Sequence, residues 1–342
     1  MNEPLEYLDE FELGGGMRPT WRSYLLHIAL LIATAITATI AGTIYPFGKT
    51  DIFPTEDPQS FSEVLQFIAS LPVKYVALVG DILHQLATNQ DGALVYGVSF
   101  SLSLLFILIS HEMGHYVACR IYKVDATLPF FIPTPPMIGP AGTFGAFIKI
   151  LSPLPSQKAV FDIGVAGPIA GFISLIPVAL VGIATMQVVS PEHAVNVQGG
   201  IVFSDPLLLK SIALLFVKDL HFGVGNPFYY AAWVGLLVTA LNLIPSGQLD
   251  GGHAIYALLG KRIHYWTGRI AFVVMATLSI LGWFLYGSPS GFLIAVLLGV
   301  MMRIPHPEPY DQTPLDGKRK ALAFATLIIF ILCFVPFPIQ IN

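Results

Sequence analysis

The sequence predicts an all-α polytopic membrane protein with about six to seven transmembrane helices and a small membrane-associated β-hairpin. Of the 342 residues, 55% are hydrophobic and only 11% are charged, which is too little charge to cover a soluble protein of this length. Apolar runs of about 20 residues, long enough to cross a bilayer, recur along the chain. The few Lys and Arg residues lie at the ends of these runs, which argues against a nucleic-acid-binding face.

Seven apolar runs account for the predicted membrane helices, and the one at 291–302 is short for a full crossing. They cover residues 24–45, 92–122, 161–189, 228–244, 268–286, 291–302 and 321–338. A further segment, 62–86, is apolar on average but contains Pro72, Lys74 and Asp81. We therefore expect it to form an interfacial or extracytoplasmic helix that does not cross.

The basic residues predict the orientation of the chain. With a cytoplasmic amino terminus, four of the 17 Lys and Arg residues fall on the outer side and thirteen on the cytoplasmic side. This is the bias that the positive-inside rule expects. The acidic first residues lack the features of a cleavable signal, so insertion should depend on internal segments. We expect a multi-pass protein of the prokaryotic cytoplasmic membrane, with a plastid membrane as the second choice.

Residues 129–155 form a Pro- and Gly-rich stretch that is too broken for a helix, yet its GTFGAFIKI portion is β-prone. Irregular backbone beside a membrane core survives only where protein or water satisfies its polar groups. A short hairpin is the favoured interpretation, and a surface loop is the alternative. The two cysteines, Cys119 and Cys333, lie far apart in different apolar runs, so we expect no disulfide framework.

The motif that carries chemistry is HEMGH, residues 111–115, inside an apolar run. On a helix, His111 and His115 share one face and can bind one zinc ion, while Glu112 stands beside them as a base. Three ionisable groups in one turn of a membrane helix are costly to insert without a function. The alternative, that both histidines only pack, is therefore disfavoured.

A catalytic zinc ion usually has three protein ligands, and the third must come from elsewhere in the chain. The strongest candidate is Asp250, in the sequence NLIPSGQLDGGH at residues 242–253, where Pro and Gly break the helix. Asp125 is a weaker candidate. His253 is either an alternative ligand or a residue whose hydrogen bond orients Asp250 or caps the helix.

The HEMGH motif and NLIPSGQLDGG together resemble the site-2 protease family of intramembrane zinc metalloproteases, peptidase family M50, in a short form without a PDZ or CBS domain. The resemblance implies His111, His115 and Asp250 as Zn²⁺ ligands. It also implies Glu112 as the catalytic base and Asn242 as a support for the substrate or the oxyanion.

The resemblance covers about residues 94–260. The AGPIAGF stretch resembles the helix between the two motifs of the family, and Gly167 and Gly171 are spaced for close helix packing. The GTFGAFI segment is similar to the membrane-associated hairpin of the family, and RIPHPEPYDQTPLDGKRK resembles short plastid and bacterial members.

No loop has room for a separate folded domain, so we expect one membrane unit in three parts. Residues 1–90 hold the tail, the first transmembrane helix and the interfacial segment; 91–265 form the catalytic core; 266–342 hold the carboxy-terminal helices. We expect an intramembrane zinc endopeptidase that cleaves transmembrane protein substrates within the lipid bilayer, with its active site toward the cytoplasm. The alternatives are a membrane protease that cuts soluble or juxtamembrane tails and a non-catalytic metal-binding adaptor or transporter.

Overall fold

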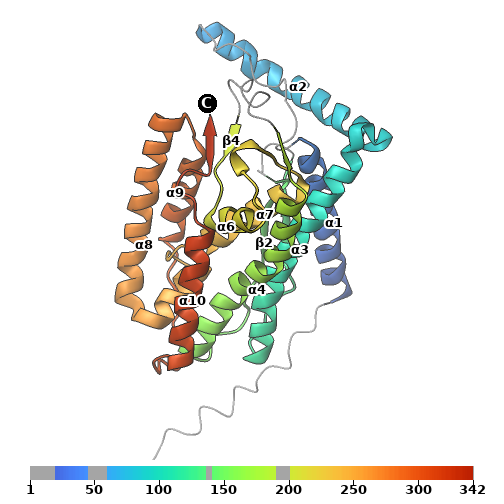
Figure 1. The fold of residues 1–342 in the computed structure, drawn as a ribbon. Coiled ribbons are helices and arrows are strands. Elements are labelled where there is room, and N and C mark those ends of the chain that lie inside the picture. Colours follow the sequence, from blue (N-terminus) through green and yellow to red (C-terminus); the bar gives the residue numbers. More distant parts are fainter. Residues whose placement is uncertain (1–19, 45–59, 136–140, 190–200, 342) are drawn as a thin grey trace, which may run out of the picture.

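The structure is a computed structural model that describes residues 20–44, 60–135, 141–189 and 201–341. Helices dominate it, and the described strands form three two-stranded antiparallel pairs (Figure 1). The main helices are α1 (Trp21–Ile44), α2 (Phe61–Thr88), α3 (Ala93–Ile121), α4 (Gln157–Ala184), α6 (Leu207–Leu215), α7 (Pro227–Asn242), α8 (Asp250–Tyr286), α9 (Ser290–Met301) and α10 (Gly317–Cys333). The strand pairs are β1 (Phe130–Pro133) with β2 (Thr143–Phe147), β3 (Gln187–Val188) with β5 (Gly223–Val224), and β4 (Ile201–Phe203) with β6 (Ile339–Ile341).

Five of the described helices, α1, α2, α3, α4 and α8, are long and apolar enough to cross a membrane. The shorter helices α7, α9 and α10 occupy the other predicted runs. Large apolar side chains such as Trp266, Phe284 and Leu293 are exposed on the outside of the bundle. Such a surface suits a lipid solvent, so the predicted polytopic membrane protein is confirmed.

Helix boundaries differ from the predicted ones where local chemistry sets them. Helix α4 begins at Gln157 because the side chain of Ser156 accepts a hydrogen bond from the amide of Ala159 and caps the helix. Helix α10 ends at Cys333, short of residue 338, since Pro336 and Pro338 cannot continue it.

Helix α2 has the length of a membrane span, although the sequence predicts that it does not cross. In Figure 1 it lies across one end of the bundle at a wide angle to α3. Of its described residues only Ile82 is buried, in contact with Ile40 of α1. The turn into α3 uses positive φ angles at Asn89, Asp91 and Gly92, which reverse the chain. That α2 stays at the interface remains a prediction.

The predicted hairpin is present as β1 and β2, although residues 136–140 of its loop lie outside the described ranges. Helix α1 holds it in place. The Nδ1 atom of His27 lies 2.9 Å from the carbonyl oxygen of Pro129. The hydroxyl of Thr37 donates to the carbonyl of Gly142 over 2.7 Å. These bonds tie backbone carbonyls of the hairpin region to α1 beside the membrane core, where polar backbone groups need protein partners.

Small residues let α3 and α4 pack closely at the centre of the bundle. A Cβ atom on Gly114 would lie only 2.4 Å from the carbonyl oxygen of Ala166. Buried residues such as Leu104, Leu175 and Leu236 join α3, α4 and α7 into one apolar core. The other two strand pairs were not predicted, because pieces of two or three residues carry no periodic signal.

Candidate metal centre

His111 and His115 lie one turn apart on α3, and both are buried. Their Nε2 atoms are 3.2 Å apart, so the two rings direct the same nitrogen to one point. A helix places residues four apart on one face, which accounts for the spacing of these two side chains along α3.

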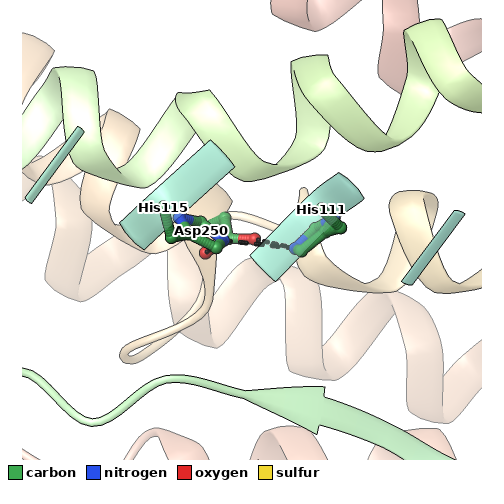
Figure 2. Close-up of side chains that lie close together, drawn as sticks. All are labelled: His111, His115 and Asp250. Atoms are coloured by element: carbon green, nitrogen blue, oxygen red, sulfur yellow. Dashed lines mark hydrogen bonds and ion pairs between the residues drawn. The ribbon is translucent and has the colours of Figure 1, made fainter. Parts of the chain in front are cut away.

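Asp250 is the first residue of α8, far from the two histidines in sequence, and its side chain reaches the same point. Its Oδ2 atom lies 3.2 Å from Nε2 of His111, and its Oδ1 atom lies 3.3 Å from Nε2 of His115. Figure 2 shows its carboxylate between the two imidazoles. Within the described residues, these three form the only group of at least three His, Cys, Asp or Glu side chains close enough to hold a metal ion.

The spacing of these donor atoms fits zinc. Ligands at about 2.0–2.1 Å from a tetrahedral zinc ion lie about 3.3 Å from one another. The two histidine nitrogens are 3.2 Å apart, and each lies 3.2 or 3.3 Å from a different oxygen of Asp250; with one ligand atom from each residue, the three atoms lie within 4.8 Å of one another. In addition, Nδ1 of His115 lies 2.7 Å from the carbonyl oxygen of Ile163. A carbonyl can only accept, so Nδ1 carries the proton and Nε2 keeps its lone pair for a metal.

Glycines on α4 leave room for the two rings. A Cβ atom on Gly167 would lie 2.1 Å from Nε2 of His115, and one on Gly171 would lie 3.1 Å from Nδ1 of His111. The sequence predicts close helix packing for these two glycines. Their contact with the histidine rings could not be predicted, because the AGPIAGF pattern does not say which side chain faces each glycine.

A cavity of about 500 Å³ opens beside the three residues. Glu112 and Asn242 line it together with them, and so do residues 146–150, which include the end of β2. Glu112 is 5% exposed, and the backbone amide of Ile148 hydrogen-bonds to its carboxylate. The Nδ2 atom of Asn242 lies 3.3 Å from Nε2 of His111. All five site residues singled out in the sequence therefore meet at one cavity.

Two weaker candidates are not brought to the three donor atoms. The backbone of Asp125 pairs with Leu151 and Ser152 in the turn after α3. His253 lines the cavity but lies outside the group that could hold a metal, and its Nδ1 atom is 2.7 Å from Nε2 of His306. His306 was not singled out in the sequence analysis. Its surroundings, PHPEP, carry no recognised spacing to a metal motif.

The chain is similar to several known proteins. Residues 99–282, more than half of its length, match peptidase family M50. The probable zinc metalloprotease EGY1, chloroplastic, of Arabidopsis thaliana is 32% identical over 71% of this chain and 42% of its own length. EGY1 of Oryza sativa subsp. japonica is 31% identical over 68% of this chain and 39% of its own length. EGY2 of Oryza sativa subsp. indica is 28% identical over 80% of this chain and 49% of its own length.

The chain thus spans less than half the length of these three relatives. No solved structure matches it significantly.

Proposed function

The chain belongs to peptidase family M50, and from that premise we propose that it is a zinc endopeptidase that cleaves transmembrane segments of other membrane proteins. The observation that carries this proposal is the cavity, which joins the three clustered residues to Glu112 inside a bundle of membrane-length helices. A base beside a metal-binding cluster is the arrangement with which zinc metallopeptidases hydrolyse peptide bonds.

His111, His115 and Asp250 would hold the zinc ion in this proposal. When bound, zinc lowers the pKa of a water molecule and polarises the scissile carbonyl. Glu112 takes a proton from water and later delivers it to the departing amine. Asn242, whose amide lies beside His111, supports the substrate or the developing oxyanion.

The substrate is proposed to bind as an extended strand. A transmembrane helix hides its peptide bonds in its own hydrogen bonds, so it must unwind before hydrolysis. Residues 146–150 line the cavity; Ala146 and Phe147 pair with β1, and residues 148–150 follow β2. Backbone groups of this segment can pair with an unwound substrate by adding a strand to the hairpin.

The proposed setting is a multi-pass membrane protein with its active site toward the cytoplasmic or equivalent side, as the charge bias predicts. The three relatives described above are named as chloroplastic proteins. Their names favour a plastid membrane over the prokaryotic cytoplasmic membrane that the sequence analysis placed first.

The test uses the purified full chain in lipid vesicles with two probes. One is a designed single-span reporter with a Gly-Pro pair in the middle of its span, and the other is soluble casein. We expect zinc-dependent cleavage within the reporter span and a loss of at least about 10²-fold in Glu112→Gln, which retains its zinc.

Undiminished cleavage by Glu112→Gln would sink the proposed mechanism. Cleavage of casein and of reporter tails, with the span left intact, would instead favour a protease of soluble segments. Absence of zinc-dependent cleavage of either probe, with zinc bound, would favour a non-catalytic role.

A further inference from the structure

His253 lies in the first turn of α8, three residues after Asp250, and lines the catalytic cavity. Its backbone amide is bonded to the carbonyl of Leu249, as a helix requires. Within the described residues its side chain makes one hydrogen bond, which joins its Nδ1 atom to Nε2 of His306 over 2.7 Å. The other ring nitrogen, Nε2, makes no hydrogen bond to the described residues.

The partner ring of His306 belongs to the loop at residues 302–316, which we name the α9–α10 loop. This ring stacks on Tyr256 of α8, with centroids 3.9 Å apart and an interplanar angle of 9°. The loop is also tied to the chain before α8, because the side-chain amide of Gln248 donates to the carbonyl of Pro305 over 2.8 Å. These contacts fix the position of His306 relative to His253.

The hydrogen bonds determine which nitrogen of each ring carries a proton. Nδ1 of His306 lies 2.8 Å from the carbonyl oxygen of Pro307, which can only accept. Burial lowers the pKa of His306 to about 3, so its ring is neutral and has one N–H group. That group is at Nδ1, and Nε2 of His306 must therefore accept a hydrogen bond from Nδ1–H of His253. The Nε2 atom of neutral His253 is left as a bare acceptor.

A hydrogen-bond acceptor that lines the cavity could bind the substrate of the proposed reaction. An unwound substrate segment exposes backbone N–H groups, and each needs an acceptor in an apolar surrounding. One side of the cavity is lined by the segment 146–150, and the α8 side is lined by Gln248, Leu249, His253 and Pro307. Among those four side chains, Gln248 and His253 carry acceptor atoms, while Leu249 and Pro307 have no polar side-chain atom; the amide of Gln248 is already tied to Pro305, and the ring of His253 offers a nitrogen lone pair.

We propose that Nε2 of His253 accepts a hydrogen bond from a backbone N–H of the bound substrate, and that His306 is a positioning residue that fixes the required tautomer. This inference rests on the proposed function, because it assigns a contact to the substrate of the same site. It also gives the α9–α10 loop a defined part in substrate binding.

The first test separates substrate binding from metal binding and folding. It uses the single-span reporter in vesicles, with KM expressed as its mole fraction in the bilayer. His253→Phe keeps a ring but removes the acceptor, and we expect KM to rise about tenfold with kcat and zinc content unchanged. His84→Phe, at an exposed position on α2, is the matched control and should behave as the wild type.

The second test addresses the tautomer. His306→Phe removes the acceptor that holds the proton of His253 at Nδ1, so we expect KM to rise several-fold. His306→Gln offers a side-chain carbonyl in its place and should restore KM to within about twofold of the wild type. A Gln variant as impaired as the Phe variant would overturn the positioning role. Zinc loss in His253→Phe, or a fall in kcat at constant KM, would overturn the substrate contact.

A spectroscopic measurement keeps this inference separate from the proposed function. In zinc-loaded Glu112→Gln, labelled with ¹⁵N-histidine, the His253 signals are assigned from their absence in His253→Phe. We expect a protonated Nδ1 and a bare Nε2, and a protonated Nε2 would overturn the inference. Activity in Glu112→Gln would instead overturn the proposed function, whatever the tautomer of His253.

Discussion

The two halves of the candidate metal centre are built differently. His111 and His115 stand on one uninterrupted helix, so helical geometry alone sets their spacing. Asp250 follows a loop in which Gly247 has a φ of +55°, and contacts from distant residues hold that loop. The Nε2 atom of His264 lies 2.9 Å from the carbonyl oxygen of Gly247, and Gln248 bonds to Pro305.

The difference shows where each half is vulnerable. The helical half needs space, because its ligand positions follow from α3 itself. The loop half needs support, because the direction of the Asp250 carboxylate depends on a loop that is held by distant residues as well as by its own turn hydrogen bonds. Substitutions that fill the space or remove the support therefore test the comparison, and their effects should fall in that order.

The largest effect is expected from Gly167→Ala. The added Cβ would meet Nε2 of His115 at 2.1 Å, while Ile163 holds the other side of the same ring. The ring must swing away from the other donors, so we expect undetectable zinc and loss of cleavage by at least about 10²-fold. Metal analysis of the purified protein and the reporter assay measure these two quantities.

Gly171→Ala is the matched variant for this prediction. Its Cβ would approach His111 at 3.1 Å, a distance that small shifts can relieve, so zinc should be retained at lower affinity. Full zinc occupancy in Gly167→Ala would show that zinc binding by His111 and His115 does not depend on the room that this glycine leaves for the His115 ring.

A smaller effect is expected from Gly247→Ala in the loop half. Alanine is strained at a φ of +55°, and its Cβ would lie 2.6 Å from the carbonyl oxygen of Met301. The loop must shift and carry Asp250 with it, so zinc affinity should fall about 10–100-fold. Competition with a chelator measures this change. In Gly80→Ala the added Cβ meets nothing within 4 Å, so this variant is the control. Equal zinc affinities of the two variants would show that the position of Asp250 does not depend on the conformation of this loop.

The same contrast explains how much the sequence could predict. The HEMGH motif predicted the helical half directly, because a helix places His111 and His115 on one face. The helix-breaking Pro and Gly residues made Asp250 the strongest candidate for the third ligand, and the family resemblance implied the same role. The loop geometry that directs its carboxylate depends on His264 and Pro305, which no local pattern connects to it. The glycines of AGPIAGF were recognised as packing residues, but their histidine contacts depend on the register between α3 and α4.

The hairpin was predictable because its β-prone stretch lies between breakers. The pairing of His253 with His306 was not, since 53 residues separate them in sequence. Most predicted spans correspond to helices, because hydrophobic length is a strong signal. The orientation of α2 depends on packing at the end of the bundle, which composition does not determine.

A loss of zinc affinity smaller than that of Gly247→Ala is expected from His264→Phe. It removes the hydrogen bond to the carbonyl of Gly247 while it keeps an aromatic ring near Tyr256. The loop loses one of its two outside supports, so zinc affinity should fall by up to about tenfold. Tyr265→Phe, at an exposed position on the same helix, is the control for the same chelator competition. A loss larger than that of Gly247→Ala would reverse the order argued here.

The smallest effect on the metal centre is expected from Arg319→Lys on α10. The guanidinium of Arg319 pairs with both carboxylate oxygens of Asp162, at 2.9 and 2.6 Å, and donates to the hydroxyl of Tyr122 at 3.0 Å. Lysine keeps the charge but loses the two-pronged contact, so stability should fall on the order of 1–2 kcal/mol, seen as a lower Tm.

Zinc affinity should nevertheless stay within about twofold of the wild type in Arg319→Lys. Asp162 directly precedes Ile163, whose carbonyl orients His115, yet the hydrogen bonds of α4 hold that backbone without help from α10. Parallel measurement of Tm and chelator competition separates the two effects. A tenfold loss of zinc affinity here would mean that the helical half also depends on distant support, and the contrast between the two halves would fail.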